Sequence, residues 1–160
     1  MIASSSNPKI RQIHLLNTKA KARRESGLFA AEGRKLFLET PSDLREAVYV
    51  SQTFEKEHPE FLTGTSYEVI EDRLFEKLCD TRTPQGILTL ARMPRYERND
   101  LLGLGTPLLL VLENVQDPGN MGTILRTAEG AGVTGVLMSR DCADLFQPKV
   151  IRSTMGSVYR

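Results

Sequence analysis

Residues 108–128 read LLLVLENVQDPGNMGTILRTA, an apolar run followed by a polar turn and an amphipathic segment. Five aliphatic residues, 108–112, come first without alternating polar residues, which is typical of a central parallel strand buried on both faces. The turn residues DPGN follow at 117–120. Residues 121–131 then place Ile124, Leu125 and Ala128 on one face of a helix, and a second strand is predicted at 133–138. Together these segments predict a β-α-β unit with parallel strands.

The polar residues 113–120 are a candidate ligand site, because ligands of parallel sheets bind beyond the carboxyl ends of the strands. We expect Asn120 to cap the following helix. Arg126 lies off the apolar face and is predicted to reach back over Gly122 toward the loop, where it would bind an anion or a ribose. A simple strand-to-helix turn with a surface arginine is the alternative. The GxGxxG and GxxxxGK[ST] phosphate motifs are absent, which disfavours ordinary dinucleotide and P-loop sites.

The first 92 residues predict a separate small α/β layer domain, because short strands and short helices alternate along them. The chain then changes composition at 93–107, which indicates a linker, and 108–160 form the second domain. We expect strands at 28–31, 47–50, 67–70 and 87–91, and helices that start at Pro8 and cover 34–39, 54–61 and 71–79. A last helix is predicted from Pro148, with Val150, Ile151 and Met155 facing inward.

The net charge of +1 conceals a strongly uneven distribution. Residues 1–35 carry eight Lys/Arg against two Asp/Glu, whereas residues 36–80 carry four against eleven. Four of the cations fall within 17–24, NTKAKARR, where the apolar helical pattern stops. This segment is either a solvated helix end or an arm that binds phosphates.

Several classes of protein are disfavoured by the composition. The longest aliphatic run, 108–112, is too short to span a membrane, and the N-terminus lacks the apolar core of a signal peptide. Cys79 and Cys142 are far apart, and His14 and His58 are isolated, so we expect no metal site and no CxxC chemistry. These features predict a cytoplasmic protein.

Residues 114–122, NVQDPGNMG, and 124–128, ILRTA, closely resemble the first signature motif of the SpoU (TrmH-like) RNA ribose 2′-O-methyltransferases of the SPOUT class. The likeness continues at 132–136, 148–152 and 155–157. The first part of the chain resembles the family's N-terminal RNA-binding domain, which has a ribosomal-protein-like fold. The matching pieces there are SNPKI at 6–10, Glu32-Gly33 and TPQGI at 83–87.

The resemblance implies an α/β fold in which an RNA-binding domain is followed by the first part of a knotted, Rossmann-like methyltransferase domain. The implied activity is methyl transfer from S-adenosylmethionine to a ribose 2′-hydroxyl of RNA, with ribosomal RNA favoured over transfer RNA. Asn120 and Arg126 would be the catalytic pair. Because guanidinium has a pKa above ~12, we expect Arg126 to act as a fixed charge rather than as a base. The cations expected to contact RNA are Lys9, Arg11, Lys19, Lys21, Arg23, Arg24, Arg34, Lys35, Lys149 and Arg152.

The family's second and third signature motifs, which form the cofactor pocket and much of the dimer interface, are expected beyond Arg160. We therefore expect a C-terminally incomplete chain that is inactive alone, and a homodimer at full length. Two other interpretations remain open. One is a non-catalytic RNA-binding protein derived from this family. The other is a different nucleotide-binding α/β protein.

Overall fold

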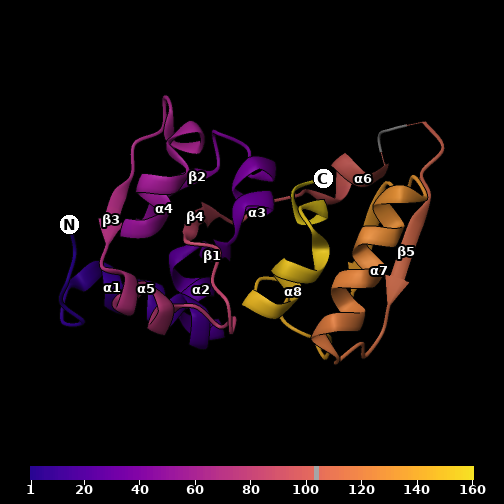
Figure 1. The fold of residues 1–160 in the computed structure, drawn as a ribbon. Helices are drawn as coiled ribbons and strands as arrows, with labels where there is room; N and C mark the ends of the chain where they lie inside the picture. Colours follow the sequence, from indigo (N-terminus) through magenta and orange to yellow (C-terminus); the bar gives the residue numbers. More distant parts are fainter. Residues whose placement is uncertain (103–104) are drawn as a thin grey trace.

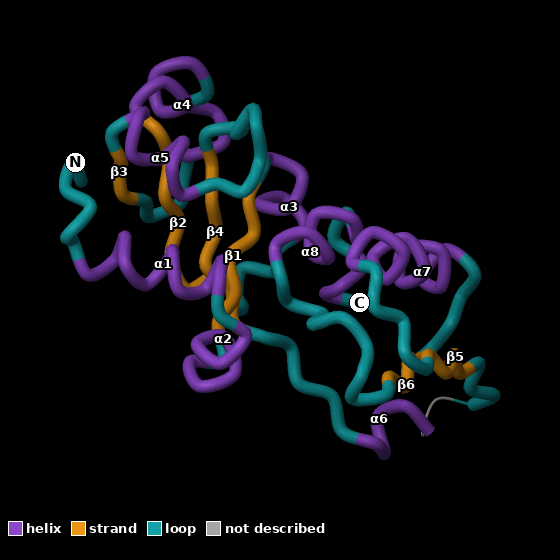
Figure 2. The backbone as a smooth tube through the Cα atoms, turned by 90° about the horizontal axis from the view of Figure 1, so that it is seen from below, coloured by secondary structure: helices purple, strands orange, loops and turns teal. Residues whose placement is uncertain are grey.

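The computed structural model describes residues 1–102 and 105–160, which form two β-sheets and their surrounding helices (Figure 1). The larger sheet contains β1 (Leu28–Glu32), β2 (Arg45–Ser51), β3 (Glu68–Ile70) and β4 (Ile87–Arg92) in the order β1-β4-β2-β3. β4 is antiparallel to β1 and β2, while β2 and β3 are parallel. Figure 2 shows these four strands side by side. The predicted alternation of strands and helices in the first 92 residues is confirmed.

The helices of this part are α1 (Pro8–Thr18), α2 (Ala20–Ser26), α3 (Arg34–Glu39), α4 (Gln52–Glu57), the 3₁₀ helix η1 (Pro59–Leu62) and α5 (Asp72–Leu78). α1 begins as predicted, because the Asn7 side chain accepts a hydrogen bond from the Lys9 N–H and Pro8 occupies the first turn. Its residues Ile10, Ile13 and Leu16 are buried. The single helix predicted at 54–61 is wrong. It divides into α4 and η1 because Pro59 has no N–H to continue the first helix.

The second sheet is the predicted β-α-β unit, made of β5 (Leu109–Leu112), α7 (Pro118–Gly130) and β6 (Gly135–Met138). β5 and β6 are parallel, and Gly132 ends the helical segment with a φ of +75°. The prediction that 108–112 are buried on both faces is wrong. Leu112 is 7% exposed but Val111 is 70% exposed. In the described residues β5 pairs only with β6, and α7 and Val150 cover just one face of the pair.

The last helix, α8 (Pro148–Thr154), lies between the large sheet and α7 (Figures 1 and 2). Its Ile151, together with Val158 of the 3₁₀ helix η2 (Ser157–Tyr159), packs against Phe29 and Ala91 of the large sheet. Val150 packs on Leu112 and Met121 on the other side. The segments that we predicted as two domains therefore share packing through α8.

The prediction for Met155 is wrong, and the predicted linker at 93–107 is partly helical. Met155 does not face inward: it is 43% exposed, because α8 ends at Thr154 and Met155 adopts a left-handed φ of 54° that turns its side chain out. The predicted linker at 93–107 contains a short helix, α6 (Arg98–Leu102). Residues 103–104 of that linker lie outside the described residues.

Candidate functional site

The loop at 113–117 lies at the carboxyl end of β5, as predicted, and a segment that follows β6 holds it there. The Asn114 N–H donates a hydrogen bond to Ser139 Oγ at 3.1 Å. The Ala143 N–H donates to the Val115 carbonyl at 2.8 Å, and the Cys142 thiol donates to the Leu112 carbonyl at 3.5 Å. Sequence reasoning missed this support, because the two segments meet only through the parallel pairing of β5 with β6.

Asp117, and not Asn120, caps α7. The Asp117 carboxylate accepts a hydrogen bond from the Asn120 N–H at 2.7 Å, so Asn120 lies inside the first turn of the helix. The prediction of an Asn120 cap was wrong because Pro118, which favours the first helical position, sets the start of the helix three residues earlier. The Asn120 residue is exposed at the amino end of α7, where free N–H groups favour an anion or a polar ligand.

Gly122 lets α7 and α8 approach closely. A Cβ atom at this position would lie 2.3 Å from the Cβ of Ser153 and 2.9 Å from the Val150 carbonyl oxygen. Any larger residue would push the two helices apart. Lys149 precedes Val150, so its backbone lies beside this contact, and its side chain is exposed.

The prediction that Arg126 reaches back over Gly122 toward the loop stays a prediction, since the cleft that Arg126 lines contains none of the loop residues 113–120. Six residues separate it from Asn120, which is about 9 Å along a helix axis. The exposed Arg126 lines an open cleft of about 490 Å³ between α3 and α7. Lys35 and Glu39 form the α3 side of this cleft, and Met155 lies at its end. The fold therefore brings Arg126 together with Lys35, 91 residues earlier in the chain.

The charges in this cleft are already partly paired. Glu39 accepts hydrogen bonds from the Lys35 ammonium and from the Arg160 guanidinium. The Lys35 hydrogen bond is the main cause of a pKa of Glu39 below its usual value, and Arg160 lowers the pKa further. Arg160 also lies 3.0 Å from a carboxylate oxygen of Glu129. The cleft is thus a mixed arrangement of three cations and two carboxylates.

One of the predicted RNA-binding cations is buried. Arg23 is 4% exposed, and its guanidinium donates to Asp144 Oδ2 at 2.6 and 3.1 Å and to the Leu16 carbonyl at 2.5 Å. We therefore assign Arg23 a structural role and remove it from the proposed RNA-binding set. Its neighbours on α2, Lys21 and Arg24, are exposed.

The remaining cations lie on α1, α2, α3 and α8, apart from Lys19, which lies between α1 and α2. Lys9 and Arg11 are exposed on α1, and Lys9 pairs with Glu68. Arg152 of α8 is half-buried and lies 3.1 Å from an Asp80 oxygen. The exposed cations are Lys9, Arg11, Lys19, Lys21, Arg24, Arg34, Lys35 and Lys149.

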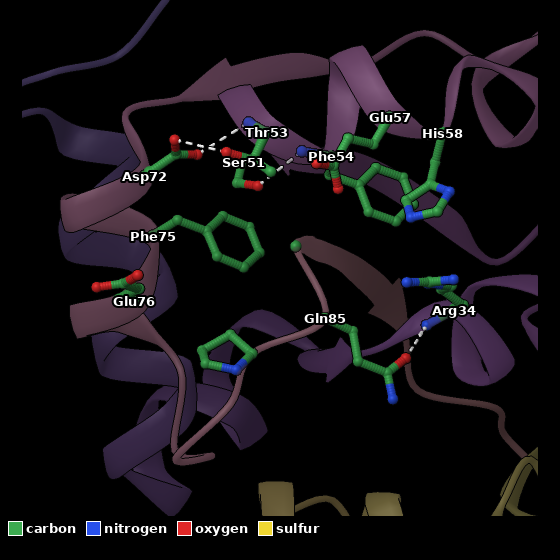
Figure 3. Close-up of a pocket in the computed structure, with 12 residues that line it drawn as sticks. Arg34, Ser51, Thr53, Phe54, Glu57, His58, Asp72, Phe75, Glu76 and Gln85 are labelled. Atoms are coloured by element: carbon green, nitrogen blue, oxygen red, sulfur yellow. Dashed lines mark hydrogen bonds between the residues drawn. The ribbon is translucent and has the colours of Figure 1, made fainter.

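The segments Glu32-Gly33 and 83–87, which are far apart in sequence, form one clasp in the structure. The Glu32 carboxylate accepts hydrogen bonds from the Gln85 N–H at 2.9 Å and from the Thr81 hydroxyl at 2.9 Å. The Gln85 side-chain oxygen in turn accepts from the Arg34 N–H at 2.9 Å (Figure 3). The clasp fixes Arg34 at the start of α3 and at the mouth of a cavity of about 310 Å³.

Neither a membrane-spanning helix nor a metal-binding cluster of side chains is found among the described residues. None of the helices in 1–102 and 105–160 combines the length and apolar character needed to cross a membrane. The same residues hold no group of three or more His, Cys, Asp or Glu side chains arranged to bind a metal ion. None of the five cavities that we describe there is lined by residues 113–120. These five cavities therefore do not include one at this loop that could hold a methyl donor.

Comparison with known proteins gives two adjoining family matches. Residues 7–89 match the MRM3-like substrate binding domain, and residues 107–160 match the SpoU rRNA Methylase family. The chain is 33% identical over 159 residues to the 23S rRNA (guanosine(2553)-2'-O)-methyltransferase RlmP of Bacillus subtilis, covering 98% of this chain and 61% of that protein. It is 35% identical over 150 residues to the human mitochondrial rRNA methyltransferase 3, covering 86% of this chain and 35% of that one.

A solved structure shares the fold of almost the whole chain. The AdoMet-bound rRNA methyltransferase from Sinorhizobium meliloti superimposes with a TM-score of 0.78 and 27% sequence identity, covering 99% of this chain and 61% of that one. The chain thus spans between about one third and three fifths of the length of these relatives.

Proposed function

Because the chain belongs to the SpoU rRNA methylase family, we propose that it takes part in the S-adenosylmethionine-dependent 2′-O-methylation of ribose in ribosomal RNA. This proposal rests on the cleft that Arg126 of α7 and Lys35 of α3 both line. The cleft connects the segment matching the methylase family with the segment matching a substrate-binding domain. An RNA strand bound along α3 would pass Arg126.

We propose that Asn120 and Arg126 hold the reacting nucleotide. The exposed Asn120 amide can donate to and accept from a ribose hydroxyl at the amino end of α7. Arg126 supplies a fixed positive charge for the adjacent phosphate, and this charge also stabilises negative charge that develops on the 2′-oxygen. S-adenosylmethionine, when bound, supplies the methyl group. We assign no contact with it to the residues described here.

The exposed cations of α1, α2 and α3 are proposed to bind the RNA backbone. This division into an RNA-binding part, 1–92, and a methyltransferase part from 108 agrees with the two family matches. Cations bind phosphates without reading sequence, so they position the RNA while the site at α7 selects the ribose. A homodimer at full length and a cytoplasmic location remain predictions. Light scattering of the full gene product measures the mass that tests the homodimer. Cell fractionation tests the cytoplasmic location.

A methyl-transfer assay on the full gene product tests the activity. Ribosomal and transfer RNA would each be incubated with S-adenosylmethionine carrying a labelled methyl group, and the labelled RNA then treated with alkali. A 2′-O-methyl group blocks the oxygen that attacks the neighbouring phosphate, so the label should remain in alkali-resistant dinucleotides. Label released in mononucleotides would place the methyl group on a base and contradict the proposal.

The alternative function is RNA binding without catalysis. Calorimetric titration of the 160-residue chain with S-adenosylmethionine, beside a titration with RNA, separates the two. RNA binding without cofactor binding would favour the alternative for this chain. Binding of both would favour methyl transfer.

A further inference from the structure

We propose that the cavity between α4, α5 and the loop before β4 binds a single unpaired RNA base (Figure 3). This inference rests on the proposed RNA-binding function, and it adds a site that lies away from Asn120 and Arg126. The cavity has a volume of about 310 Å³. That volume is large enough for a nucleobase.

The walls of the cavity are aromatic. Phe54 and Phe75 are 2% and 1% exposed, so they close the cavity without offering a free ring face. The half-buried His58 ring, 5.0 Å from the Phe54 ring, and the exposed Arg34 guanidinium are the flat groups that a base can reach. Figure 3 shows Phe75 on one side of the cavity and the Phe54–His58 pair on the other. Proteins bind unpaired bases by stacking them on aromatic rings such as histidine and on arginine guanidinium planes, since every base offers a flat π face.

Hydrogen bonds hold the residues of the cavity in place, and they occupy the Asp72 carboxylate at its floor. Asp72 accepts hydrogen bonds from the Thr53 N–H at 3.0 Å and the Thr53 hydroxyl at 2.9 Å. The backbone hydrogen bond is the largest cause of a lowered pKa of Asp72. At Gly86, a Cβ atom would lie 2.8 Å from the Phe54 Cβ atom, and the φ of +80° also favours glycine. A bound base therefore requires little rearrangement of the floor.

The polar rim favours bases that carry an amino group. Glu57 and Glu76 line the cavity, and both are exposed. Ionised carboxylates only accept hydrogen bonds, so they suit the amino groups of guanine, adenine and cytosine. Uracil has no amino group: its single N3–H donor stands between two carbonyl oxygens that repel a carboxylate, so uracil would be disfavoured. The carboxylates also make this cavity a poor phosphate site, which separates its role from that of the basic helices.

The mouth of the cavity leads toward the proposed methyl-transfer site. The Arg34 guanidinium lies 5.9 Å from the centre of the Phe54 ring. There it can contact both a stacked base and the phosphate of the same nucleotide. Lys35, the next residue, lines the cleft with Arg126. A base held in this cavity would therefore anchor an RNA strand that continues along α3 toward Arg126.

Nuclear magnetic resonance titration of the 160-residue chain tests the site directly. Guanosine 5′-monophosphate should shift the amide signals of Phe54, Gln85 and Gly86, while ribose 5-phosphate, which lacks the base, should not. Uridine 5′-monophosphate should need about fivefold more ligand for the same shift, as one lost charge-assisted hydrogen bond implies. Equal shifts from ribose 5-phosphate, or from the polyamine spermidine, would refute a base site.

Matched variants test whether the carboxylates at the rim of the cavity cause the preference for bases with an amino group. The chain should bind a labelled oligouridine with one central guanosine about fivefold more tightly than oligouridine alone. Glu57→Gln combined with Glu76→Gln should abolish this difference, because glutamine can also donate to uracil. Glu46→Gln, an exposed site outside the cavity, should preserve it. Equal affinity of the unmodified chain for both RNAs would overturn the base site alone. Absence of methyl transfer in the earlier assay would refute only the proposed activity.

Discussion

The guanidinium of Arg23 on α2 lies 2.6 Å from Asp144 Oδ2, in the segment that leads into α8. This ion pair joins residues 121 positions apart. The Arg23 side chain is 5% exposed and that of Asp144 is 29% exposed. The Asp144 carboxylate also accepts a hydrogen bond from the Phe146 N–H at 3.0 Å. The pair therefore ties the basic N-terminal helices to the helix that packs against α7.

Replacing Arg23 should destabilise the fold. Arg23→Ala removes three hydrogen bonds and leaves Asp144 unpaired, so we expect a loss of about 2 kcal/mol in the free energy of unfolding, less than for a fully buried pair. Urea unfolding followed by circular dichroism measures the change. Arg24→Ala, at an exposed position on the same helix, should change stability by less than about 0.5 kcal/mol. Equal midpoints for the two variants would contradict the structural role of Arg23.

The close approach of α7 and α8 should make Gly122 intolerant of a methyl group. The Cβ of Gly122→Ala would overlap Ser153, with an expected loss of about 1–3 kcal/mol. Gly130→Ala has open space around its Cβ and lies in the same helix, so it should be neutral or stabilising by up to about 1 kcal/mol. Thermal unfolding of both variants compares them directly. The close packing inferred here would be wrong if Gly122→Ala unfolded no earlier than Gly130→Ala.

A lysine at position 126 should bind RNA but support little methyl transfer. Lysine keeps the positive charge and loses the planar, bidentate donor geometry of arginine. In the full gene product we expect Arg126→Lys to lower kcat by about 100-fold with an RNA Kd within about threefold of the unmodified protein, in line with the loss of one preorganised donor. Near-normal turnover of the lysine variant would show that a positive charge alone suffices.

The exposed cations of α2 should set the salt dependence of RNA binding. Each phosphate contact adds about 0.7 to the slope of log K against log salt for a single strand. Lys21→Ala combined with Arg24→Ala should therefore reduce this slope by about 1.4. Fluorescence anisotropy at several salt concentrations measures it. Lys56→Ala, a charge change on exposed α4, serves as the control and should leave the slope unchanged. An unaltered slope in the α2 variant would exclude this helix from the RNA path.

Alkaline pH should destabilise the protein through two half-buried groups, the Tyr159 hydroxyl and the Cys79 thiol. Burial raises the pKa of the Tyr159 hydroxyl from 10.0 to about 12 and that of the Cys79 thiol from 9.0 to about 12. The folded state holds these protons more tightly than the unfolded state, so their contribution is complete below pH 9 and is lost as the pH rises to 12. The urea concentration at the unfolding midpoint should fall as the pH rises from 8 to 11. The midpoint of the Cys79→Ala variant should fall less steeply above pH 9. Parallel curves for the two proteins would contradict the burial of the thiol.

The local patterns of the sequence predicted most of the elements correctly. Asn7-Pro8 indicated the start of α1, Pro148 the start of α8 and Gly132 the end of the helical segment before β6. These signals depend on backbone conformation within a few residues, which the side chains there determine. The same reasoning failed at Asn120, because Pro118 starts the helix earlier and Asp117, three residues before Asn120, caps it.

Local sequence patterns were enough to predict the β-α-β unit, the layered first part and the motif that identifies the family. Which charges are available, and which distant side chains line the same cleft, depends on tertiary packing. Arg23 resembles its neighbours in sequence but is buried, whereas Arg126 and Lys35 meet across a cleft that no pattern indicated. The cavity around Phe54 draws on α4, α5 and the loop before β4, which are separate in the chain. Periodicity and capping act within one element, while burial and ion pairing depend on how distant elements pack.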